Sequence, residues 1–96
     1  MKAVLIVHNA AIESDVNDIL ESVGVDGFTK FPNTLGKGLL SEPHLDSDVW
    51  PGVNCSTLIV TDEAKAGQLM NEVRKMRERL GTEGVKGFMW QIDQVT

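Results

Sequence analysis

Residues 24–54 decide the fold of this chain, and they read GVDGFTKFPNTLGKGLLSEPHLDSDVWPGVN. A short strand is predicted at Gly27–Phe31, and residues 32–54 then show neither helical nor strand periodicity. A strand rich in β-branched residues follows at Cys55–Val60. Loops longer than about 12–15 residues are uncommon in compact domains and are usually functional or disordered. We therefore expect the function to be concentrated in the loop 32–54.

The sequence before this segment predicts one strand and one helix. Ala3–Val7 is an apolar, β-branched run, which suits a strand. A helix is predicted from about Ile12 to Val23, because the apolar residues there recur at helical spacing: Ile12, Val16, Ile19 and Val23. Glu13 and Asp15 fall in its first turn, where the helix dipole favours negative charge, and Gly24 is placed to end it.

The sequence after the segment predicts a second helix and a last strand. Thr61 is expected to cap the helix, with Asp62 and Glu63 in its first turn and Gly81 at its end. Its buried stripe is predicted to be Ala66, Leu69, Val73, Met76 and Leu80. Val85–Ile92 is predicted as a strand with Phe88 and Trp90 on one face.

These elements give the order β-α-β-loop-β-α-β over a single domain, residues 1–96. That order predicts an α+β, ferredoxin-like βαββαβ fold, in which two helices cover one face of an antiparallel sheet. The strands nevertheless carry apolar residues at positions of both parities. The face without helices therefore needs a partner, and we expect an oligomer.

Composition excludes several classes of function. The chain has 96 residues and a net charge of −5, and its one basic cluster is interleaved with acidic residues on the second helix: Arg74, Lys75, Arg77 and Arg79. That cluster reads as a solvated helix face, so nucleic acid is not an expected partner. The single Cys55 excludes an intramolecular disulfide, and no apolar run is long enough to span a membrane. A cytoplasmic protein is expected.

Three short motifs carry a resemblance to a known family. Residues Gly24 to Thr29 look like a Gly-x-x-Gly-x-Thr entry into the second strand, Gly36-Lys37-Gly38 looks like the Gly-x-Gly that opens a mobile loop, and Gly84-Val85-Lys86 looks like a Gly- and Lys-containing entry into the last strand. With the topology, these motifs make the chain resemble the PII-like superfamily of small trimeric regulators, which includes the PII nitrogen regulators and CutA-type proteins. The resemblance implies a homotrimer whose inter-subunit clefts bind adenine nucleotides and whose long T-loop engages a partner protein.

The chain also departs from PII proteins. Leu39 and Leu40 stand where those proteins carry the Arg and Gln that contact phosphates and help to position Mg²⁺ and 2-oxoglutarate, and the chain has no tyrosine for uridylylation. The segment 44–54, with its Trp-Pro-Gly-x-Asn turn, looks more like a divergent branch of the superfamily. The resemblance therefore implies ligand sensing without the standard set of phosphate contacts.

The candidate ligand-binding residues are Thr29, Gly36, Lys37, Gly38 and Lys86. A threonine hydroxyl can read a base or a small polar group, and a lysine ammonium is a point charge for phosphate or carboxylate. Backbone N–H groups of Gly36-Lys37-Gly38 can form an anion-binding nest, although a flexible turn is the simpler interpretation. Thr29 and Lys86 can equally be a strand threonine and a surface lysine.

A metal site is the alternative. His44, Asp46 and Asp48 alternate, so an extended backbone places their side chains on one side, and imidazole with carboxylates is a reasonable set of ligands for a divalent metal. His8 and Cys55 could add ligands, but a free cysteine at a strand start is more often a small buried hydrophobe. These residues carry the second hypothesis, a CutA-like metal-binding protein.

Leu39, Leu40 and Trp50 are the candidate docking residues for a protein partner, because apolar side chains in a polar loop can form a contact patch. Trp50 can instead fold back onto its own subunit. The third hypothesis is accordingly a protein-interaction module that needs no ligand. No nucleophile–base arrangement is recognisable, so we expect no enzymatic activity.

Overall fold

The computed structural model describes residues 1–35, 53–80 and 84–96. Within these ranges the chain forms four strands, two α-helices and one short 3₁₀ helix. The strands are β1 (Lys2–Asn9), β2 (Thr29–Thr34), β3 (Asn54–Thr61) and β4 (Val85–Gln91), and the helices are η1 (Ala10–Ile12), α1 (Glu13–Val23) and α2 (Glu63–Leu80).

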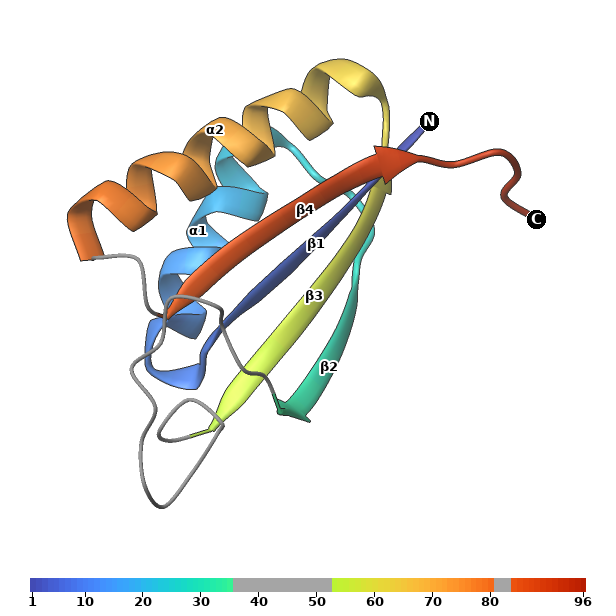
Figure 1. The fold of residues 1–96 in the computed structure, drawn as a ribbon. Coiled ribbons are helices and arrows are strands. Elements are labelled where there is room, and N and C mark those ends of the chain that lie inside the picture. Colours follow the sequence, from blue (N-terminus) through green and yellow to red (C-terminus); the bar gives the residue numbers. More distant parts are fainter. Residues whose placement is uncertain (36–52, 81–83) are drawn as a thin grey trace.

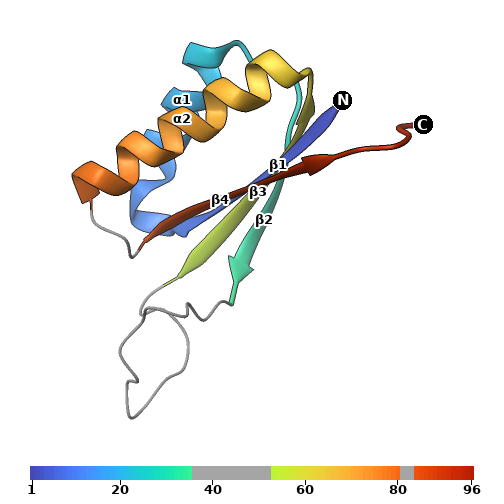
Figure 2. The same ribbon diagram turned by 45° about the horizontal axis from the view of Figure 1, so that its top comes forward.

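The four strands form one antiparallel sheet in the order β2-β3-β1-β4. Both helices lie against the same face of this sheet, and the opposite face carries no element of the described chain (Figures 1 and 2). The ferredoxin-like fold predicted from the order of elements is therefore confirmed. The helix-bearing side is called the covered face below, and the other side the open face.

The hydrophobic core lies between the covered face and the two helices. Strand residues Val4, Ile6 and Ile59 are fully buried there, and they meet the apolar stripes of the helices: Val16, Ile19, Leu20, Ala66, Leu69, Val73 and Met76. Gly87 brings β4 close to α2, since a Cβ on Gly87 would lie 3.2 Å from Val73 Cγ1. The predicted stripes are largely right, but Leu20 was not predicted and Leu80 is 43% exposed at the end of α2.

Two helix starts differ from the prediction. The first helix begins with the 3₁₀ turn η1, where the Asn9 side chain accepts the Ala11 N–H at 2.9 Å, and the α-helix follows from Glu13. Asp62, rather than Thr61, caps α2, because its Oδ1 accepts the Lys65 N–H at 2.8 Å while Thr61 is still paired in β3. The end of α1 is as predicted, with Gly24 in the left-handed region at φ 85°.

The boundaries of the long segment also differ. Strand β2 starts at Thr29 and continues to Thr34, and β3 begins at Asn54, so the predicted bounds of 32 and 54 were too wide. The added residues pair with β3 across an irregularity in register between Phe31 and Thr34, where Asn33 has φ 57°. A proline and a bulge are tolerated here because β2 is an edge strand. The last strand ends one residue earlier than predicted, at Gln91.

The strands meet segments 36–52 and 81–83 at one end of the sheet, called the loop end below. Antiparallel pairing places the ends of β1 and β2 beside the starts of β3 and β4, with Asn9 and Thr34 opposite Asn54 and His8 opposite Val85 (Figure 1). Among the described helices, none is long and apolar enough to cross a membrane.

Candidate functional site

The open face carries three partly exposed aromatic side chains at its edges. Strand parity places Leu5 of β1 beside Leu58 of β3 and Phe88 of β4, all on this face. Phe88 and Trp90 on β4 are 43% and 45% exposed, and Phe31 on β2 is 46% exposed. The prediction that Phe88 and Trp90 share a face is confirmed. The open face is thus an apolar surface that runs from one sheet edge to the other.

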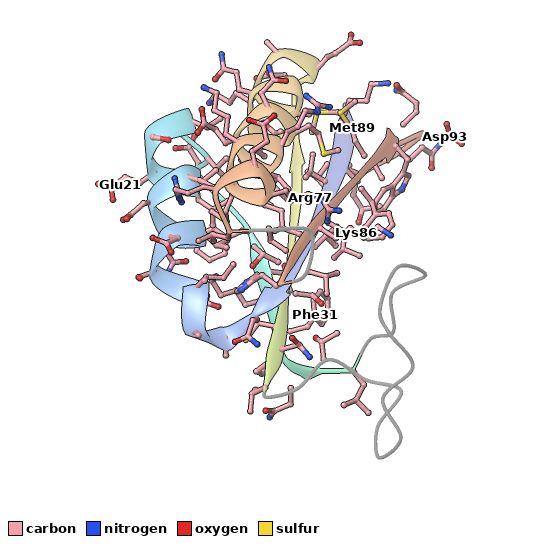
Figure 3. The ribbon with its side chains drawn as sticks, turned by 60° about the vertical axis from the view of Figure 1, so that its left-hand side comes forward. Glu21, Phe31, Arg77, Lys86, Met89 and Asp93 are labelled. Atoms are coloured by element: carbon pink, nitrogen blue, oxygen red, sulfur yellow. The ribbon has the colours of Figure 1, made fainter. Side chains whose placement is uncertain are left out.

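Lys86 lies on this open face near the loop end. It stands opposite Val7 in β1, and Figure 3 shows it on the far side of the molecule from Glu21 of α1. Its Nζ lies 5.3 Å from the centroid of the Phe88 ring, an arrangement that holds the ammonium by a cation–π interaction. Within the described ranges it forms no ion pair, so its charge is available to an anion.

Lys86 is positioned from the covered side by α2. Arg77 donates from Nη1 to the carbonyl oxygen of Val85 at 2.6 Å, which fixes the start of β4 one residue before Lys86. Val85 itself is 1% exposed and belongs to the core. Arg77 was read from the sequence as part of a solvated helix face, and this contact gives it a structural role that helical spacing alone does not reveal.

Thr29, the other described candidate, is exposed at the start of β2 and pairs with Leu58. It lies on the open face like Lys86, but β2 and β4 are the two opposite edges of the sheet. Three strand spacings separate these edges, roughly 14 Å at about 4.8 Å each. One chain therefore does not bring Thr29 and Lys86 into contact.

The other predicted site residues lie outside the described residues. These are the ligand-binding Gly36, Lys37 and Gly38, the docking residues Leu39, Leu40 and Trp50, and the metal ligands His44, Asp46 and Asp48. In the part of the chain that is described, no group of three or more His, Cys, Asp and Glu side chains is arranged to hold a metal ion. Their predicted roles stay predictions.

A polar cluster on the covered face was not predicted. Glu13, at the start of α1, places Oε2 3.3 Å from Nε2 of His8, and its other carboxylate oxygen accepts a hydrogen bond from Lys30 of β2. Lys30 Nζ also lies 3.3 Å from the Thr57 hydroxyl, and Cys55 stands directly opposite His8. We call His8, Glu13, Lys30 and Cys55 the polar cluster; it joins three strands to the first helix.

The polar cluster shifts the pKa of two of its members. Burial on its own raises the pKa of the Glu13 carboxyl, but hydrogen bonding and charge from Lys30, with His8, bring it below its ordinary value of 4.5. Burial raises the pKa of the Cys55 thiol, and the Glu13 carboxylate raises it further. Glu13 is thus ionised at neutral pH, whereas Cys55 is a neutral thiol and a poor nucleophile.

A pocket of about 270 Å³ adjoins the polar cluster. Its lining comes from the loop end of β2 and β3 and from η1: Ala10, Glu13, Lys30, Pro32 and Cys55. Cys55 is half-buried rather than fully buried, which corrects the alternative interpretation of it as a small core residue. The sequence signal for the cluster was a charged or polar residue at positions that face the helices, but this signal needs the strand register, which periodicity does not supply.

Comparisons with known proteins bear on the whole fold. A scan against protein-family models finds no match, and a search of curated proteins finds none either. Among solved structures, the chain is similar to CPII from Thiomonas intermedia K12 bound to ADP and bicarbonate, with 25% identity and a TM-score of 0.71 over 95% of this chain and 84% of that chain.

Two further structures agree with this match. CPII bound to ADP, AMP and bicarbonate, described as a nitrogen regulatory PII-like protein, has a TM-score of 0.73 at 21% identity, over 95% of this chain and 88% of that chain. A PII-like signalling protein from Thermus thermophilus has a TM-score of 0.64 at 22% identity, over 95% of this chain and 85% of that chain. The resemblance drawn from the glycine motifs and the topology is therefore confirmed, and the fold is that of the PII-like superfamily, with which this chain groups.

Proposed function

We propose that this protein is a ligand-responsive regulator that assembles as a homotrimer and binds an adenine nucleotide between subunits. The observation that carries the proposal is that Thr29 and Lys86 share the open face but lie at opposite edges of it. A second copy that covers this face can bring its own Thr29 edge to the Lys86 edge of the first. The site is complete only between copies.

The open face supports copies of this chain as its occupant. Its middle is apolar on both central strands, with Leu5 opposite Leu58, and aromatic side chains flank it at both edges. Both edge strands present an aromatic ring next to a lysine, since Lys30 lies 5.4 Å from the Phe28 ring and Lys86 lies 5.3 Å from the Phe88 ring. A cyclic arrangement that joins one edge to the other buries this surface in every copy.

In this proposal each predicted residue has a distinct role. The Lys86 ammonium binds the phosphates, the Thr29 hydroxyl of the neighbouring subunit reads the base or ribose, and Gly36-Lys37-Gly38 offers backbone N–H groups to the same anion. Similarity to CPII, whose structures contain ADP, AMP and bicarbonate, supports an adenine nucleotide as the first ligand to test.

The segment 32–54 is the proposed output of the regulator. A ligand that binds one arrangement of this segment better than another shifts the population toward it, and so changes the affinity for a partner protein. Leu39, Leu40 and Trp50 are the proposed docking side chains. The protein acts in the cytoplasm and catalyses no reaction under this proposal.

Two substitutions test the inter-subunit cleft directly. Lys86→Met should weaken ADP binding by at least tenfold in isothermal titration, and Thr29→Val by a smaller factor, whereas Lys75→Met, which removes an exposed lysine paired with Glu72 on α2, should leave binding unchanged. Light scattering should give three times the mass of the chain. A monomer at micromolar concentration would overturn the architecture.

Mixing the two variants tests whether their residues belong to one cleft. If Thr29 and Lys86 come from different subunits, every mixed trimer contains at least one cleft with both residues intact. Unfolding and refolding the two inactive variants together should therefore restore part of the binding that each has lost. No recovery on mixing, with trimers formed, would place the two residues in separate sites.

A further inference from the structure

His8 is fully buried, and both nitrogens of its ring face oxygen atoms. Nδ1 lies 2.9 Å from the carbonyl oxygen of Asn9, and Nε2 lies 3.3 Å from Oε2 of Glu13. A carbonyl oxygen and an ionised carboxylate are both acceptors. Neither neighbour can donate a proton to the ring, so the ring must supply the donors on both sides.

Only one charge state of His8 satisfies both contacts. A neutral imidazole has one N–H, and it leaves a lone pair against either the Asn9 carbonyl or the Glu13 carboxylate. The imidazolium donates to both. The buried atoms Nε2 of His8 and Oε2 of Glu13 have no other hydrogen-bond partner, so losing the proton leaves one buried polar contact unsatisfied.

The charges around His8 come from each element packed on it. From α1, Glu13 is anionic and bridges His8 to the Lys30 ammonium of β2. From β3, Cys55 is a neutral thiol. From α2, the Arg77 guanidinium is held on the carbonyl oxygen of Val85, the residue opposite His8 in β4. Glu13 is thus the one anion among these neighbours, shared by two cations.

The backbone next to His8 contacts both segments that meet the sheet at the loop end. The Asn9 N–H donates to the carbonyl oxygen of Gly84 at 2.7 Å, and the Ala10 N–H donates to that of Val53 at 2.7 Å. Gly84 immediately precedes β4 and Lys86, and Val53 immediately precedes β3. The Asn9 carbonyl that accepts from His8 lies between these two amides, in the same turn of chain.

We propose that His8 is a proton-operated switch, in which loss of its proton releases the Asn9 carbonyl or the Glu13 carboxylate and shifts the backbone contacts to Gly84 and Val53. The switch is built into the covered face, but it acts at the loop end. Histidine is suited to this role because its charge changes between about pH 5 and pH 8.

The first test follows the ring and the backbone together by NMR from pH 5 to pH 8. The His8 ring signals, assigned by their absence in His8→Gln, should titrate, and the amide signals of Ala10 and Gly84 should move with the same midpoint. Ring signals that do not change over this range would overturn the proposal. So would ring titration with Ala10 and Gly84 stationary.

Two acidic residues of α1 provide a matched pair of variants. Glu13→Gln keeps the shape of the side chain but removes the anion that faces His8, and it should lower the proton affinity of His8 about tenfold. Glu21→Gln removes the same charge from an exposed position that points away from the sheet, and it should leave the midpoint unchanged (Figure 3). Equal midpoints in both variants would contradict the role of Glu13.

A consequence for ligand binding rests on the proposed function. ADP affinity should change at least threefold between pH 5.5 and pH 8 in the wild-type protein and should change less in His8→Gln. Absence of ADP binding at every pH would refute the proposed ligand alone, because the NMR titration measures the switch in the free protein. A pH dependence of affinity that is equal in both proteins would overturn the coupling.

Discussion

The two faces of one sheet follow opposite rules in this protein. On the covered face, the buried charges of the polar cluster have partners and apolar side chains such as Ile59 are fully enclosed by α1 and α2. On the open face, Phe88 and Trp90 are nearly half exposed, and Lys86 has an aromatic ring rather than a carboxylate beside it. The covered face is finished within one chain, whereas the open face is suited to other molecules.

The largest expected effect compares neighbouring residues of β3 that face opposite ways. Ile59→Ala should cost about 2–5 kcal/mol of unfolding free energy at any protein concentration, because it leaves a cavity in a core closed by the chain itself. Leu58→Ala should cost less in dilute protein, and its effect should grow with concentration as the copies associate. Urea unfolding at several protein concentrations measures both.

That comparison breaks if the two faces respond alike. A Leu58→Ala loss that is as large as that of Ile59→Ala and independent of concentration would mean that the open face is stabilised within the chain. The proposed assembly through this face would then have no support from stability.

A smaller effect is expected from the two lysines that lie near aromatic rings. Lys30→Met should cost about 1–3 kcal/mol, because Glu13 and the Thr57 hydroxyl lose their shared cation in a partly buried position. Lys86→Met should change stability by less than about 0.5 kcal/mol, since a surface position without an ion pair contributes little. Thermal unfolding of the two variants without ligand checks the difference.

The lysine pair separates structure from function. Lys30→Met should be less stable with little direct effect on ADP binding measured well below its melting temperature, and Lys86→Met should show the reverse. Equal stability losses for the two would show that the open-face lysine has a structural partner after all.

Periodicity predicted much of this contrast, because it depends on local spacing. The alternation in β4 placed Phe88 and Trp90 together, and the helical stripe of α2 placed Leu69 and Val73 in the core. The polar cluster was missed because it depends on register: His8 meets Cys55 and Glu13 only once β1 pairs with β3 and η1 turns the chain back over the sheet.

The misplaced helix cap has a similar cause. Thr61 and Asp62 are both good capping residues by composition, and the choice between them was made by how far β3 pairs with β1. Thr61 pairs with Lys2, which leaves Asp62 as the first residue free to receive the Lys65 N–H. The roles predicted for residues 36–52 depend on contacts beyond the described chain, and they stay predictions.

Acid titration should show a weaker effect that belongs to the covered face. The pKa of Glu13 is below its ordinary value of 4.5, so its ionised form stabilises the fold above that pH, and this stabilisation is lost as the pH falls through the lowered value. Glu13→Gln should therefore unfold less steeply with acid than the wild-type protein below pH 4.5. Parallel acid unfolding curves followed by circular dichroism would show that other carboxylates dominate.

The smallest expected effect lies at the alkaline end and concerns Cys55. Its pKa is raised above the ordinary value of 9.0, so the folded state favours the neutral thiol; the resulting stabilisation is complete below pH 9 and is lost as the pH rises through the raised value. Cys55→Ser does not titrate there, so its stability should fall less between pH 8 and pH 10.5 than that of the wild-type protein under reducing conditions. Because Cys55 is half-buried beside the Glu13 carboxylate, a thiolate there would be repelled and only partly solvated. If the two proteins lose stability equally over this range, the thiol is solvated well enough to ionise in place, and the covered face is more open to water at the pocket than its buried charges indicate.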